Sequence, residues 1–161
     1  MIRYYISLGS NLGDRLAYLQ AGLDGIREHG MDVIAVSPVY ETAPWGNTEQ
    51  GAFLNAVAII ATEKSAEAVL QELLLIELEQ QRERKVHWGP RTLDLDIIEA
   101  EGLSCDSLRL TLPHPRYWDR AFVLVPLAEL EPDWEYQGVS IGERIRELGT
   151  QGIQATGMVL K

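Results

Sequence analysis

Residues 88–98 read WGPRTLDLDII, and this stretch organises the rest of the chain. The Gly89-Pro90 pair predicts a turn, because proline cannot continue a helix from upstream. Apolar and acidic residues then alternate, which is typical of a strand with its two faces in different surroundings. We therefore predict a strand whose apolar side chains, Leu93, Leu95 and Ile97, face a core.

Asp94 and Asp96 share the other face of this predicted strand, with their attachment points about 7 Å apart. Carboxylates at this spacing can converge on one or two cations, and paired catalytic metals lie about 3.5–4 Å apart. Arg91, just before the strand, has the forked donor geometry that suits phosphate. An Asp-x-Asp pair can also be only the solvated face of a half-exposed sheet. Aspartate is depleted in strands, however, and with Arg91 and Trp88 immediately upstream the pattern favours a metal–polyphosphate site.

Residues 87–98, HWGPRTLDLDII, resemble the signature of the 6-hydroxymethyl-7,8-dihydropterin pyrophosphokinases of folate biosynthesis. The resemblance extends from Leu8-Gly9-Ser10-Asn11, which is similar to the family's opening motif, to Arg120-Ala121-Phe122. It implies an enzyme that transfers pyrophosphate from ATP to the hydroxymethyl group of the dihydropterin and releases AMP. Two positions depart from the family pattern. His87 stands where an arginine is expected, and Leu74 replaces a polar residue, which puts one nucleotide contact in doubt.

The same resemblance implies roles for individual residues. Asp94 and Asp96 would hold two Mg²⁺ ions that bridge the ATP phosphates. The catalytic set would comprise Arg82, Arg91, Asp94 and Asp96. The ATP-binding set would comprise Arg84, Trp88, Arg91, Ile97, Arg109, Thr111, His114 and Arg120. The pterin would stack between Phe53 and Phe122, a geometry that suits a flat heterocycle. The remaining substrate-binding residues would be Thr42, Pro44, Trp45 and Asn55.

Composition and charge restrict the kind of protein. The 161 residues predict one domain, 1–161, with 46% apolar and 24% charged residues. A net charge of −10 argues against nucleic acid as a partner, which requires a basic surface. The apolar runs are shorter than the ~20 residues of a membrane span. The single cysteine fits a reducing cytosol. We therefore expect a cytoplasmic monomer that acts on ATP and a reduced pterin alcohol, without membrane or nucleic-acid partners.

The hydrophobic pattern predicts an α+β protein of ferredoxin-like, split βαβ layout. Strands are expected at 4–8, 31–39, 53–62, 93–98 and 108–112, and loops at 41–51, 80–87 and 101–107. Helices are expected at 16–29, 65–78, 123–130 and 141–148, with Pro115 at the first position of a helix. Gly30 is expected just after the end of the first helix, and Ser65 is expected to cap the second. The order β-α-β-β-α-β gives a mainly antiparallel sheet with helices packed on it and a C-terminal helical extension. The helix at 65–78 is apolar around most of its circumference and should be largely covered. The segment after Gly149 carries no recognisable pattern.

Several side chains have two open interpretations. Glu77 is either a solvated edge residue or a partner for the metal or an arginine. Trp45 packs on the core or lies over a planar ligand, and His114 is structural or donates to phosphate. The charged segment 80–87 is a solvated segment or a loop that closes over polyphosphate. Two other functions also remain: a non-catalytic nucleotide- or pterin-binding module, or a different metal-dependent phosphoryl transferase.

Overall fold

The computed structural model describes residues 1–43, 52–81 and 92–161, with the side chain of Gln81 excepted. The main sheet has the strand order β10-β3-β4-β1-β5, and β2 also pairs with β4. All of these pairings are antiparallel. The strands are β1 (Ile2–Ser10), β2 (Asp32–Val36), β3 (Tyr40–Thr42), β4 (Phe53–Thr62), β5 (Asp94–Ala100) and β10 (Ile153–Ala155). The predicted α+β, ferredoxin-like class with a mainly antiparallel sheet is confirmed.

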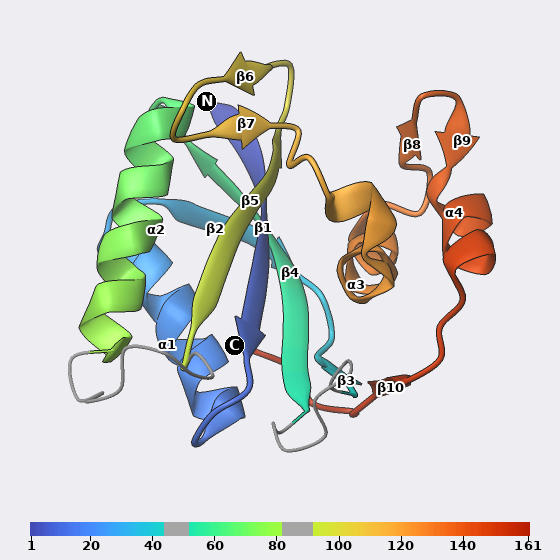
Figure 1. Cartoon of the computed structure of the whole chain (residues 1–161). Helices are drawn as coiled ribbons and strands as arrows, with labels where there is room; N and C mark the ends of the chain where they lie inside the picture. The colour runs from blue at the N-terminus through green and yellow to red at the C-terminus, as the bar shows by residue number, and fades with distance from the viewer. Residues whose placement is uncertain (44–51, 82–91) are drawn as a thin grey trace.

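Helices cover both faces of this sheet (Figure 1). On one face lie α1 (Arg15–Glu28) and α2 (Ala66–Gln81), as the apolar patterns at 16–29 and 65–78 predict. The other side carries the short helix η1 (Tyr117–Asp119), α3 (Ala121–Leu130) and α4 (Ile141–Leu148). Two small hairpins complete the chain: β6 (Cys105–Asp106) with β7 (Thr111–Leu112), and β8 (Glu135–Tyr136) with β9 (Val139–Ser140). The part of the chain described contains no helix that is long and apolar enough to cross a membrane.

Strand β1 is central and separates two hydrophobic cores. Its Tyr4, Ile6 and Leu8 are buried in the core beneath α1 and α2. Tyr5 points to the opposite face, where it joins the core beneath η1 and α3. There its ring meets Trp134 edge-to-face, with ring centroids 4.7 Å apart. Because successive side chains of a strand alternate between faces, one strand supplies both cores.

Local signals place the helix ends. The Asp14 side chain accepts a hydrogen bond from the Ala17 N–H at 3.2 Å, which caps α1. The helix ends at Glu28, and Gly30 follows its cap residue with a φ of +82°, which suits glycine. Ser65 caps α2 in the same way, through a 3.2 Å bond from the Ala68 N–H. The predicted cap residues Ser65 and Gly30 are therefore confirmed.

The prediction that α2 is largely covered is wrong. Val69, Leu73 and Ile76 are completely buried against α1 and the sheet. Their neighbours Leu74, Leu75 and Leu78 have exposed fractions of 54%, 45% and 60%. The reason is geometric, since a helix in a single outer layer buries one face and leaves the opposite face to solvent.

Other element boundaries also differ from the prediction. The expected strand 31–39 is interrupted around Pro38, and β2 ends at Val36. The next strand, β3, runs from Tyr40 to Thr42 and so includes the first two residues of the expected loop 41–51. Of the expected strand 108–112 only Thr111–Leu112 is extended, and it pairs with β6 in the expected loop 101–107. Pro115 does not begin a helix, because the chain first forms η1 and α3 starts at Ala121.

Candidate active site

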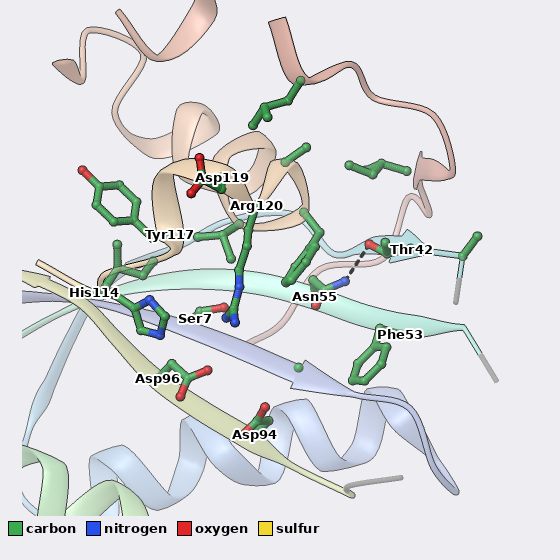
Figure 2. Close-up of a pocket in the computed structure, with 18 of the residues that line it drawn as sticks. Ser7, Thr42, Phe53, Asn55, Asp94, Asp96, His114, Tyr117, Asp119 and Arg120 are labelled. Carbon is green, nitrogen blue, oxygen red and sulfur yellow. Dashed lines mark hydrogen bonds between the residues drawn. The ribbon is translucent and has the colours of Figure 1, made fainter. Parts of the chain in front are cut away.

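A cavity of about 710 Å³ lies between the sheet and the η1–α3 segment. Figure 2 shows side chains from several strands and from η1 converging on it. Its walls combine strand ends that are far apart in sequence. The lining residues are Ser7, Gly9, Thr42, Ala43, Phe53, Asn55, Asp94, Asp96, Ile98, His114, Tyr117, Asp119, Arg120, Ala121, Phe122, Val123, Leu148, Gly149, Gln151 and Ile153.

The two acids stand on β5 as the alternation predicts. Leu95 and Ile97 are buried in the core with α1 and α2, and Asp94 and Asp96 point into the cavity (Figure 2). Opposite them on β1 stand Gly9, paired with Asp94, and Ser7, paired with Asp96. These small partners leave space in front of both carboxylates.

The aromatic and amide residues occupy the other end of the cavity. Phe53 and Phe122 both line it. Beside them, Asn55 Nδ2 donates to Thr42 Oγ1 at 2.7 Å, and both side chains are buried. A Cβ added to Gly9 would lie 3.4 Å from Asn55 Oδ1 and 3.8 Å from the Phe53 ring. The absence of a side chain at Gly9 therefore keeps open the space between the aromatic end and the acids.

Arg120 and His114 provide the cationic and donor groups near the acids. Figure 2 shows the Arg120 side chain extending from the start of α3 toward Ser7 and His114. His114 Nδ1 accepts a hydrogen bond from the Arg116 N–H at 3.1 Å, so in the neutral ring the proton lies on Nε2. Burial lowers the pKa of His114, and the guanidinium groups of Arg120 and Arg116 lower it further. At neutral pH His114 is therefore an uncharged donor through Nε2.

A smaller cavity of about 270 Å³ adjoins the first and shares Asp96 and His114 with it. It collects the predicted residues Ile97, Arg109 and Thr111. Its other lining residues are Leu70, Ser107, Leu108, Leu110 and Pro115. The described residues predicted to bind ATP or the pterin therefore line two neighbouring cavities, and Asp96 and His114 line both.

Six predicted site residues lie outside the described residues: Pro44, Trp45, Arg82, Arg84, Trp88 and Arg91. The described ones all line one of the two cavities. These are Thr42, Phe53, Asn55, Asp94, Asp96, Ile97, Arg109, Thr111, His114, Arg120 and Phe122. Their roles toward ligands remain proposals.

The sequence did not predict the C-terminal wall of the large cavity. Leu148, Gly149, Gln151 and Ile153 line it. The chain turns at Gly149, where φ is +80°, and then forms β10 against β3, with Ile153 opposite Thr42. The Ala43 N–H donates to the Gly152 carbonyl at 2.8 Å. Three residues of strand carry little periodic signal, so only the pairing with β3 reveals this wall.

The donor set fits a cation that is bound together with substrate. Among the residues that the structure describes, no group of three or more His, Cys, Asp or Glu side chains is placed to hold a metal. Asp94 and Asp96, however, face one cavity from the same strand. Mg²⁺ typically takes one or two carboxylates and completes its octahedron with water and substrate phosphate oxygens. Two adjacent carboxylates in a roomy cavity match that requirement.

Known proteins are similar to this chain over most of its length. Residues 5–132 match the family model described as 7,8-dihydro-6-hydroxymethylpterin-pyrophosphokinase. A relative from Methylorubrum extorquens is 42% identical over 155 residues, covering 96% of this chain and 98% of the relative. One from Pseudomonas aeruginosa is 46% identical over 132 residues, covering 81% and 82%. Both are named 2-amino-4-hydroxy-6-hydroxymethyldihydropteridine pyrophosphokinase.

The fold is also similar to that of a solved structure. The crystal structure of wild-type Plasmodium falciparum HPPK-DHPS with pteroate matches with a TM-score of 0.69 at 13% identity. The match covers 91% of this chain and 42% of that longer chain. At this identity the likeness shows the fold alone, whereas the family match and the curated relatives span most of the sequence. The chain therefore belongs to the 7,8-dihydro-6-hydroxymethylpterin-pyrophosphokinase family.

Proposed function

We propose that this chain transfers pyrophosphate from ATP to the hydroxymethyl group of 6-hydroxymethyl-7,8-dihydropterin, giving the pterin diphosphate and AMP in folate biosynthesis. One observation carries the proposal beyond family membership. A single cavity joins an aromatic and amide end, built by Phe53, Phe122 and Asn55, to an acidic end, built by Asp94 and Asp96. A flat heterocycle held at the first end would present its alcohol toward polyphosphate held at the second.

The pterin end selects by shape and by edge hydrogen bonds. Phe53 and Phe122 would take the faces of the ring, because aromatic side chains pack well against flat π-systems. The Asn55 amide offers a donor and an acceptor side by side, which suits the alternating edge of a pterin. Thr42 accepts one amide hydrogen of Asn55 and so fixes the direction of that edge. Orientation of the alcohol follows from orientation of the ring.

The nucleotide end holds ATP by groups spread over both cavities. Arg109, Thr111 and Ile97 line the smaller cavity, which we assign to the nucleoside side. His114 and Arg120 stand at the junction, where the phosphates would pass. His114 would donate through Nε2 without adding charge, and Arg120 would supply a guanidinium to a phosphate oxygen.

Asp94 and Asp96 would hold Mg²⁺, with two ions expected. When bound together with ATP, the metal would neutralise phosphate charge and keep the reacting oxygens in place. The chain's part is to present both carboxylates on one strand face and to keep the alcohol and the phosphate in one cavity. The proposed site is completed by residues outside the described part, on the nucleotide side Arg82, Arg84, Trp88 and Arg91, and on the pterin side Pro44 and Trp45.

The proposal extends to the state of the protein. We infer one domain over residues 1–161, acting as a monomer in the cytoplasm on two small-molecule substrates. The net charge of −10 supports the exclusion of nucleic acid, because it opposes binding to phosphate backbones.

The deciding experiment follows the phosphate label. The protein is incubated with Mg²⁺, γ-³²P-labelled ATP and the pterin alcohol, and the products are separated. We expect AMP and a labelled pterin diphosphate. ADP with a pterin monophosphate would show an ordinary kinase, and pterin binding without any product would show a binding module.

A further inference from the structure

Glu77 is a buried acid on α2, beside the strand that carries both cavity-facing carboxylates. Only 6% of its surface is exposed, so the first of its two open interpretations, a solvated edge residue, is wrong. Its Oε2 accepts a hydrogen bond from the backbone N–H of Leu95 at 2.7 Å. Leu95 lies between Asp94 and Asp96 in the sequence, and its own side chain is buried in the core on the opposite face.

The position of β5 in the sheet explains why this contact matters. β5 stands at one end of the strand order and pairs with β1. An edge strand presents half of its backbone groups away from its partner strand, where they need other partners. On this outer edge the Leu95 N–H donates to Glu77, and the Ile98 carbonyl accepts from the His114 N–H at 2.8 Å. The backbone is thus held by hydrogen bonds at Leu95, just before Asp96, and at Ile98, two residues after it.

A carboxylate at a buried helix position carries a desolvation penalty. Burying a charge is unfavourable unless hydrogen bonds compensate it, and an apolar side chain would pack beside Leu73 and Ile76 without that penalty. A charged acceptor makes a stronger and more directional bond to a backbone N–H than a neutral one does. The observed contact is made at Leu95, the residue between the two acids.

We propose that Glu77 is a positioning residue that fixes the β5 backbone between Asp94 and Asp96, so that both carboxylates face the cavity in a constant arrangement. The inference rests on the proposed function, in which these two acids hold Mg²⁺ with ATP. Partners that orient metal ligands from behind typically change metal affinity 10–100-fold when they are removed. We expect the lower part of that range, because Glu77 acts through the backbone.

The test compares two variants of similar size. Glu77→Gln keeps an amide oxygen that can accept from the Leu95 N–H, and Glu77→Leu removes the acceptor. Glu67→Ala, an exposed acid on the same helix, is the matched control. Calorimetry would measure the binding of a non-hydrolysable ATP analogue as a function of Mg²⁺ concentration, and pterin binding separately.

We expect Glu77→Leu to raise the Mg²⁺ concentration needed for nucleotide binding about tenfold, with the pterin Kd within twofold of the wild type. Glu77→Gln should recover most of this loss, and Glu67→Ala should change neither quantity. An unchanged Mg²⁺ requirement in Glu77→Leu would overturn the inference. Equal weakening of pterin and nucleotide binding would also overturn it, because that result indicates general loss of structure.

A second measurement needs no variant. Amide hydrogen exchange of the wild-type protein should show the Leu95 N–H protected, although it faces the outer edge of β5. Rapid exchange there would contradict the Glu77–Leu95 contact on which the inference rests. The binding experiments remain decisive even if no AMP is formed from ATP and the pterin alcohol. That result would contradict the proposed function but not the positioning role of Glu77.

Discussion

Replacing Thr42 by valine tests how the pterin end of the cavity is built. Valine keeps the β-branched shape that suits β3 but removes the hydroxyl, so this exchange is not neutral. The hydroxyl oxygen accepts the Asn55 Nδ2 bond of 2.7 Å, and both residues are buried, with exposed fractions of 6% and 4%. In the variant that amide hydrogen loses its partner.

Leaving a buried donor unsatisfied costs about 1–3 kcal/mol. We expect the lower half of that range, because Asn55 lines the cavity and water can reach this region. For a chain of this length, each 1 kcal/mol lowers Tm by about 2–4 °C. A loss of about 1–2 kcal/mol therefore predicts a Tm lower by about 2–8 °C. The same loss of amide orientation should weaken pterin binding about fivefold or more, since 1.4 kcal/mol corresponds to a factor of ten.

Thermal unfolding and calorimetric titration with the pterin alcohol measure these two effects. Thr150→Val is the control, because Thr150 is exposed. Binding of an ATP analogue should stay at the wild-type value, since Thr42 lines the opposite end of the cavity from the acids. A variant with wild-type Tm and wild-type pterin affinity would refute the role given to the Thr42–Asn55 pair.

Three further predictions concern the metal site, the helix pair and the C-terminal wall. Alanine at both Asp94 and Asp96 should abolish turnover but leave the pterin Kd within twofold, and substantial AMP formation by the double variant would contradict the assignment. His29 has a pKa raised mainly by its hydrogen bond to Glu72, so its stabilising effect is complete below its unfolded pKa of about 6.5 and is lost as pH rises through the folded value. Urea unfolding should therefore show that wild-type stability falls more than that of His29→Gln as pH rises above about 6.5; equal slopes would count against the interaction. Gln151 lines the cavity on the side of Thr42 and would offer the pterin one partly solvated hydrogen bond, so Gln151→Ala should raise the KM for the pterin alcohol about threefold, with the KM for ATP unchanged. A change in the KM for ATP alone would contradict the role of Gln151 in pterin binding.

The sequence alone determined the features that depend on a few adjacent residues. A strand repeats every two residues, so the order Leu-Asp-Leu-Asp is sufficient to place Asp94 and Asp96 on one face and Leu95 on the other. Helix ends depend on bonds that reach three or four residues along the chain, and Ser65 and Gly30 marked them correctly. The apolar pattern of each long element also predicted the α+β order.

Only the tertiary structure decided which of these local features meet. Phe53 and Asp94 share one cavity because β1 lies between β4 and β5, with Gly9 leaving the space open. The pairing of β1 with β5 joins Gly9 to Asp94, more than 80 residues apart, and β1 also pairs with β4, so no local pattern encodes the register. The same is true of β10, whose pairing with β3 brings Gln151 and Ile153 to the cavity.

Burial is likewise a property of the assembled fold. The composition of α2 predicts a covered helix, yet its outer leucines are exposed while the acid Glu77 is buried. Side chains on one helix differ in this way because the edge of β5 lies against one side of α2 and solvent lies against the other. The residue types of this protein determine what each side chain can do chemically, and the packing of distant elements decides which partner it finds.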